Sequence, residues 1–117
     1  MKLNILLIED DRSVRLTLAY ILQALNHDVA EAESIEMAKE YLASTKFDLV
    51  ICDQNLWDGY LGTNLLTEFA QTYPGMQRML MSGSRDPGGY TAAFLRKPFS
   101  LPEVQAKLES MFQTTPP

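Results

Sequence analysis

Short, almost continuously apolar runs alternate along the chain with segments whose apolar residues recur every three or four positions. A short continuous apolar run is typical of a strand that is buried on both faces, as in a parallel sheet. Residues 3–8 and 47–52 have this pattern, and residues 79–81 and 92–95 are weaker examples. Residues 29–33 alternate more, which predicts a strand nearer an edge. The sequence therefore predicts five strands.

The segments between these runs predict helices, each with one buried face. Ser34 can cap the second helix, and the third begins near Thr63 and ends at Pro74-Gly75. The last opens on residues 100–103, Ser-Leu-Pro-Glu, a capping box with proline in the first turn. The predicted buried positions are Val14, Leu18, Leu22 and Leu25, then Ile35, Ala38 and Leu42, then Leu65, Leu66 and Phe69, and finally Val104, Leu108 and Met111.

Strands that alternate with helices imply a parallel sheet with right-handed crossovers. The predicted fold class is therefore a doubly wound α/β domain with a five-stranded parallel sheet. We expect the domain to span residues 1–113, with residues 114–117 as a tail or the start of a linker. In such sheets ligands bind beyond the carboxyl ends of the strands, so functional residues are expected there.

Composition narrows the function classes. The 117 residues are the usual size of one domain, and the net charge of −5 argues against a nucleic-acid surface, which needs clustered Lys and Arg. Cys52 is the only cysteine, which excludes an intrachain disulfide, and we interpret it as a small buried residue. The apolar runs are too short for a signal-peptide core or a membrane span. We therefore expect a cytoplasmic protein without a membrane partner.

Acidic, hydroxyl and basic side chains stand where the predicted strands end. Glu9 and Asp10 follow the first strand, Asp53 the third, Ser82 the fourth and Lys97 the fifth. In a parallel sheet they would meet at one edge. Two carboxylates about 4 Å apart repel by roughly 4 kcal/mol at an effective dielectric constant of 20, and a hard cation such as Mg²⁺ relieves this. A lysine and a hydroxyl group on the same edge would suit phosphoryl oxygens.

With these residues in place, the chain resembles the response-regulator receiver family, the CheY-like superfamily of the flavodoxin-like fold, over nearly its whole length. The resemblance implies that Asp53 accepts a phosphoryl group, with Mg²⁺, from a sensor histidine kinase or a histidine phosphotransfer protein. It implies a signalling switch rather than an enzyme with a separate substrate. The switch would act on a downstream effector or on a fused output domain, and the resemblance identifies neither. The matching segments are Leu-Leu-Ile-Glu-Asp-Asp at 6–11, Asp-Leu-Val-Ile-Cys-Asp-Gln-Asn-Leu at 48–56, Met-Ser-Gly at 81–83 and Phe-Leu-Arg-Lys-Pro-Phe at 94–99.

The resemblance also implies the roles of single residues. Asp10 would bind Mg²⁺ directly and Glu9 through water, together with Asp53 and the backbone carbonyl of Asn55. Ser82 would turn toward the phosphoryl group. Lys97 would pair with that group, aimed by a cis Lys97–Pro98 peptide bond.

Further roles implied by the resemblance compete with simpler interpretations. Phe94 matches the family's switch aromatic, although it can also be a core residue, and Asn55 and Ser84 stand at positions that tune acyl phosphate hydrolysis. We interpret Asp11 as a first-turn residue that favours the helix dipole rather than as a metal ligand. His27, in a helix-to-strand turn, is interpreted as a surface residue without a ligand role.

The loop after Asp53 departs from the family pattern. Trp57 and Leu61 stand where the family usually has proline and glycine. Glycines at Gly59 and Gly62 indicate a one-residue insertion, and Trp57 is expected to restrict access to Asp53.

A larger departure follows Ser82, because only residues 83–96 separate it from Lys97. A helix of about 11–12 residues, a strand of about 4 and two loops of at least about 2 each need about 19 residues. The family's fourth helix is therefore predicted to be reduced or absent. Residues 83–91 contain turn-forming residues. We expect signalling through the first or the last helix, or through a change of order of this segment on phosphorylation.

Two other functions stay open at the level of sequence. A phosphorylation-independent interaction module would keep the fold without the switch, and the shortened segment favours it while the complete site opposes it. A metal-dependent phosphohydrolase with an aspartyl nucleophile usually has a second acid two positions after the nucleophile, where this chain has Asn55.

Overall fold

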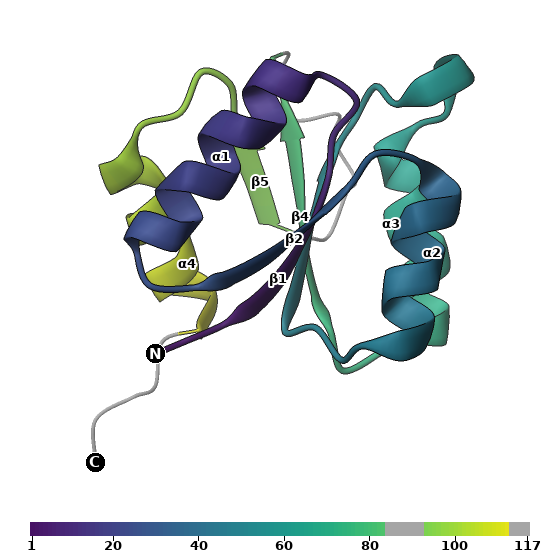
Figure 1. The fold of residues 1–117 in the computed structure, drawn as a ribbon, viewed down its shortest axis with the longest axis horizontal. Coiled ribbons are helices and arrows are strands. Elements are labelled where there is room, and N and C mark those ends of the chain that lie inside the picture. Colours follow the sequence, from purple (N-terminus) through teal and green to yellow (C-terminus); the bar gives the residue numbers. More distant parts are fainter. Residues whose placement is uncertain (84–92, 113–117) are drawn as a thin grey trace.

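The five strands form one parallel sheet in the order β2-β1-β3-β4-β5. Figure 1 shows this sheet in the centre of the molecule, with helices on both of its faces. The computed structural model describes residues 1–83 and 93–112. The strands are β1 (Asn4–Ile8), β2 (Asp28–Ala32), β3 (Leu49–Asp53), β4 (Gln77–Ser82) and β5 (Ala93–Arg96). The helices are α1 (Arg12–Ala24), α2 (Ile35–Ser44), α3 (Gly62–Thr72) and α4 (Leu101–Phe112), with a short 3₁₀ turn, η1 (Trp57–Gly59). The predicted fold class is confirmed, including the edge position of β2.

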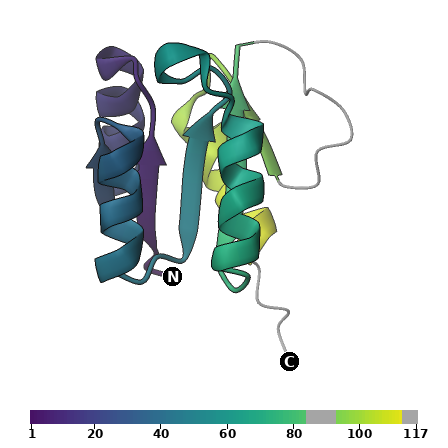
Figure 2. The same ribbon diagram turned by 90° about the vertical axis from the view of Figure 1, so that its right-hand side faces the viewer.

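Two apolar layers hold the helices against the sheet. Successive side chains of β1 point to opposite faces, so Ile5 and Leu7 pack with α1 and α4, whereas Leu6 and Ile8 pack with α2 and α3. Figure 1 shows the sheet nearly edge-on between α1 and α4 on one side and α2 and α3 on the other, and Figure 2 looks onto the face that α2 and α3 cover. Because both faces are covered, the middle residues of the central strands β1, β3 and β4 are apolar, which explains the continuous runs in the sequence.

The N-termini of α1, α2 and α4 are fixed by side-chain caps. The Asp11 carboxylate accepts a hydrogen bond from the Val14 amide (3.2 Å), and the Ser34 hydroxyl accepts one from the Met37 amide (3.0 Å). At the start of α4, the Ser100 hydroxyl accepts from the Glu103 amide (3.3 Å) and donates to the Glu103 carboxylate (2.9 Å). The predicted caps at Ser34 and Ser100 are therefore confirmed, and Asp11 serves the first helix as its N-cap.

The interpretation of His27 as a surface residue is wrong. Its side chain is buried, and Nδ1 accepts a hydrogen bond from the Leu3 amide (3.0 Å). Burial, together with the N-terminal ammonium group, lowers the pKa of His27. The turn after α1 folds back onto the start of β1, a contact between residues distant in sequence that the local pattern does not encode.

Several sequence-based expectations fall outside the described residues. They are the reduced fourth helix and the change of order within residues 83–91, the tuning role of Ser84, and the tail at 114–117. Strand β4 ends at Ser82 and β5 begins at Ala93, so residues 83–92 join two adjacent parallel strands. In the described part of the chain, no helix has the length and apolarity needed to cross a bilayer.

Candidate functional site

The predicted site residues meet at one edge of the sheet. Strands β1 and β3 are neighbours, with Ile8 opposite Cys52, so Glu9 and Asp53 follow paired residues. Ser82 ends β4 beside β3, and Lys97 follows β5 on the other side of β4. The strand order reverses between β1 and β3, and ligands of doubly wound sheets bind at such a reversal.

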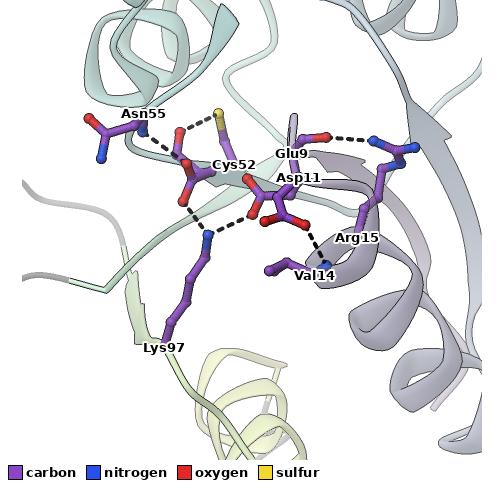
Figure 3. A network of polar contacts seen from close by, with 8 residues as sticks. Glu9, Asp11, Val14, Arg15, Cys52, Asn55 and Lys97 are labelled. Atoms are coloured by element: carbon purple, nitrogen blue, oxygen red, sulfur yellow. Dashed lines mark hydrogen bonds and ion pairs between the residues drawn. The ribbon is translucent and has the colours of Figure 1, made fainter.

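Lys97 joins the two buried carboxylates of the site (Figure 3). Its Nζ lies 2.7 Å from Asp53 Oδ1 and 2.6 Å from Glu9 Oε1. The Lys97 amide donates to the Ser82 carbonyl (2.8 Å), which fixes the backbone of the lysine beside β4. The Lys97–Pro98 peptide bond is cis, the predicted isomer.

Hydrogen bonds on both sides hold Asp53 in place. The Asn55 amide donates to Asp53 Oδ2 (3.0 Å), while Lys97 binds Oδ1. The Cys52 thiol donates to the Asp53 carbonyl (3.4 Å), and burial, with the charges of Asp53 and Glu9, raises the pKa of this thiol well above its usual value. Cys52 is fully buried, as predicted, and it supports the backbone of Asp53 as a neutral donor.

Glu9 is a carboxylate whose charged form is disfavoured by its burial. The residue is fully buried, and in the described part of the chain its Oε2 atom has no hydrogen-bond partner. Burial raises the pKa of Glu9 to about 7, with a further rise from Asp53, against the opposing hydrogen bond from Lys97. Burial also lowers the pKa of Lys97, but its bonds to Asp53 and Glu9 outweigh burial, so the pKa is raised overall.

The acidic residues form a possible metal site. One carboxylate oxygen from each of Glu9, Asp10 and Asp53 can be chosen so that all three lie within 4.8 Å of one another. Glu9 and Asp53 are buried and Asp10 is exposed. Oxygen ligands of this kind suit a hard cation, and the unpartnered Glu9 Oε2 atom provides a buried acceptor that a cation or its bound water could satisfy. The donor set therefore fits Mg²⁺.

Ser82 and Phe94 lie on the neighbouring strands β4 and β5, and their expected roles stay predictions. Ser82 is buried at the end of β4, opposite Arg96 of β5. Phe94 is partly buried and packs against the core layer beneath α2 and α3.

The loop between β3 and α3 is a small closed hairpin. Asp58 and Gly59 both have positive φ (56° and 72°), and the Tyr60 amide donates to the Trp57 carbonyl (3.0 Å), as in a type I′ turn. Asn55 pairs with Leu61 as an antiparallel bridge. The Asp58-Gly59 pair is a strong hairpin signal that the sequence analysis missed.

Trp57 is the first residue of the turn that closes this hairpin. It is partly buried and packs against the core layer beneath α2 and α3. Its expected effect on access to Asp53 stays a prediction.

Arg15 is a second residue that sequence reasoning missed. It is buried on α1, and its Nη1 donates to the main-chain oxygen of Glu9 (2.8 Å). Its signal in the sequence is a charge at an apolar position, because Arg15, Leu18 and Leu22 have i, i+3, i+7 spacing on the buried face of the helix.

Comparison with known proteins agrees with this geometry. The family model of the response regulator receiver domain matches residues 5–109. Response regulator protein FleR of Pseudomonas aeruginosa is 37% identical over 82 residues, which are 70% of this chain and 17% of FleR. The KDP operon transcriptional regulatory protein KdpE of Escherichia coli is 30% identical over 112 residues, 90% of this chain and 49% of KdpE. The chain thus spans half or less of these curated relatives.

Solved structures show the same fold. The signal receiver domain of an HD domain-containing protein from Pseudomonas fluorescens Pf-5 superposes with a TM-score of 0.83 at 27% identity, covering 94% of each chain. The receiver domain of the PhyR response regulator from Erythrobacter litoralis gives a TM-score of 0.80 at 25% identity, covering 99% of this chain and 95% of that domain.

Proposed function

This chain belongs to the response regulator receiver domain family, and from that premise we propose that it is a phosphoacceptor switch in which Asp53 accepts a phosphoryl group. The donor is a phosphohistidine on a sensor histidine kinase or a histidine phosphotransfer protein. The observation that carries this proposal is the placement of the Asp53 carboxylate, buried, bonded to Lys97 and the Asn55 amide, and clustered with Glu9 and Asp10.

The proposed transfer is a nucleophilic substitution at phosphorus. A carboxylate oxygen of Asp53 forms the new O–P bond, while the N–P bond of phosphohistidine breaks and its electron pair returns to the imidazole nitrogen. Lys97 already bonds the acceptor carboxylate, so its ammonium group lies where it can exchange that bond for one to a phosphoryl oxygen. The product is an aspartyl phosphate with an ammonium group beside its added negative charge.

Mg²⁺ would be held by the carboxylates of Glu9, Asp10 and Asp53 and by the backbone carbonyl of Asn55. When bound, Mg²⁺ supplies positive charge that neutralises the phosphoryl oxygens during transfer. The protein's own contribution is to keep the acidic residues together before the metal arrives. Lys97 does this by offsetting the repulsion between Glu9 and Asp53.

The phosphorylated state would then alter a binding surface. In this proposal Ser82 and Phe94 move with the new charge, and Asn55 and Ser84 set the rate at which the acyl phosphate is hydrolysed. The downstream effector, or an output domain beyond this chain, would respond to the altered surface.

A phosphohydrolase is less well supported, because Asn55 stands where those enzymes place their second acid. The buried Asp53–Lys97 pair also argues against an interaction module without a switch.

Acetyl phosphate with Mg²⁺ tests this function. The intact mass of the wild-type protein should rise by one phosphoryl group, and Asp53→Asn should not be labelled. Asp58→Asn is a matched control, since it removes an exposed carboxylate from the same loop at a left-handed position that asparagine tolerates. Turnover of acetyl phosphate well beyond one equivalent would indicate a hydrolase, and equal labelling of Asp53→Asn would refute the assignment.

A further inference from the structure

We propose that Arg15 is a positioning residue for the metal site, which holds the Glu9 main chain so that the Glu9 and Asp10 carboxylates are presented to Mg²⁺. This inference rests on the proposed function. It adds a residue that touches neither the metal nor the phosphoryl group.

The guanidinium group contacts the acidic turn from the side opposite Lys97. Its Nη1 donates to the Glu9 carbonyl (2.8 Å), while the Glu9 carboxylate accepts from Lys97 (2.6 Å). Figure 3 shows the Arg15 bond on the main chain of Glu9 and the Lys97 bond on its side chain. Glu9 is thus held at both ends, which restricts the rotation of the peptide that leads into Asp10.

Two glutamates hold Arg15 in turn. Its Nε lies 3.3 Å from Glu31 Oε1, and its Nη2 lies 3.7 Å from Glu33 Oε1. The Arg15 side chain is 6% exposed, whereas those of Glu31 and Glu33 are 32% and 70% exposed. Arginine can serve all three acceptors because its donors form a rigid planar fork, and a lysine ammonium group at this position has no such fork. The end of β2 is thereby connected to the turn after β1.

The rest of the turn is fixed by other groups. The Asp11 carboxylate caps α1 and is thereby held by the Val14 amide. Asp10, between the two fixed residues, is exposed and belongs to the acidic cluster. Its direction therefore depends on the peptide units on either side of it, one of which Arg15 binds.

The positive charge of Arg15 and its contact with the Glu9 main chain predict opposite effects of Arg15→Met on Mg²⁺ affinity, so the two roles can be separated by experiment. Arg15→Met removes a positive charge near a cation site, so an electrostatic role alone predicts tighter Mg²⁺ binding. A positioning role predicts weaker binding, by about tenfold or more, as for other outer contacts of metal ligands. Removing Arg15 alone leaves Glu31 and Glu33 without this partner and should lower stability, but both glutamates are accessible to solvent, so neither becomes an uncompensated buried charge.

The experiment measures Mg²⁺ affinity by calorimetry and, in the metal-free protein, amide exchange of Asp10 and Asp11. We expect Arg15→Met to weaken Mg²⁺ binding at least about tenfold and to speed exchange at both amides. Glu31→Ala, at a partly exposed position, should give a smaller change in the same direction. Arg78→Met is the matched control, because Arg78 Nη1 also donates to a main-chain carbonyl, that of Leu66 on α3 (3.5 Å). The Mg²⁺ affinity of this variant should stay within about twofold of wild type.

Unchanged or tighter Mg²⁺ binding in a folded Arg15→Met variant would overturn the proposal. So would amide exchange at Asp10 and Asp11 equal to that of wild type. If wild-type protein itself fails to bind Mg²⁺ or to label Asp53, the proposed function fails, and the metal role of Arg15 fails with it. That result is distinguishable, because the defect then appears without any substitution at Arg15.

Discussion

A Cβ atom added to Gly62 would collide with the main-chain oxygen of Asp53. The first residue of α3 therefore packs directly on the end of the strand that carries the proposed phosphoacceptor. The Gly62 amide also donates to the Gln54 carbonyl (2.8 Å). The Asp58-Gly59 turn closes the loop that leads from Asp53 to Gly62, and Gly62 lies against the backbone of the proposed acceptor.

Gly62→Ala should lower both stability and phosphorylation. The methyl group must displace either the Asp53 backbone or α3, and overpacking of this kind costs about 1–3 kcal/mol. Urea denaturation would measure the stability, and acetyl phosphate labelling would measure the acceptor. Gly75→Ala is the control, because an added Cβ there meets no atom within 4 Å. If Gly62→Ala had the stability and the labelling of wild type, the close contact between position 62 and the Asp53 backbone would not be required for either.

Lys97→Ala should separate metal binding from phosphoryl transfer. Removing the ammonium group removes a cation that competes for the Glu9 and Asp53 carboxylates, so Mg²⁺ affinity should rise. Phosphorylation by acetyl phosphate should nevertheless slow by about 100-fold, the usual loss for a donor to developing charge. Lys107→Ala on α4 should change neither quantity. Fast labelling of Lys97→Ala would exclude a role for Lys97 in transfer.

Glu9 should make the metal-free protein less stable as pH rises. Its pKa is 4.5 when unfolded and about 7 when folded. The folded state thus binds the proton more tightly, and the resulting stabilisation is complete below pH 4.5 and lost as pH rises through about 7. The loss is at most about 3 kcal/mol.

The comparison that isolates this effect is wild type against Glu9→Gln in the presence of a chelator. The difference between their free energies of unfolding, measured from pH 4.5 to pH 8, should shift against the wild type as pH increases. A difference that stays constant over this range would mean that Glu9 has an ordinary pKa.

Trp57 should report Mg²⁺ binding. It is the only tryptophan and lies four residues after Asp53, on the loop that supplies Asn55. We predict a change in fluorescence on Mg²⁺ titration that is lost in Asp10→Ala. Asp11→Asn keeps a side chain that can cap α1 and should retain the response. A response that survives Asp10→Ala would place the metal elsewhere.

The sequence by itself determined the fold class and the set of residues at the site. Continuous apolar runs of strand length require a sheet covered on both faces, and that sheet brings the ends of its parallel strands to one edge. For this reason the sequence alone places Glu9, Asp10, Asp53, Ser82 and Lys97 at that edge, while their roles remain predictions. The burial of Cys52 follows from the same periodicity.

Only the tertiary structure decided how distant segments contact one another. The local pattern predicts a surface position for His27, yet its ring is buried and accepts a hydrogen bond from the Leu3 amide. The same pattern gives no partner for Arg15, which donates to the Glu9 main chain. Lys97 can bond both Glu9 and Asp53 because the ends of β1, β3 and β5 lie close together in the sheet. Local periodicity records which face of an element is buried, because burial follows the repeat of that element. It does not record which polar group meets which partner, because that depends on the register and packing of segments far apart in the chain.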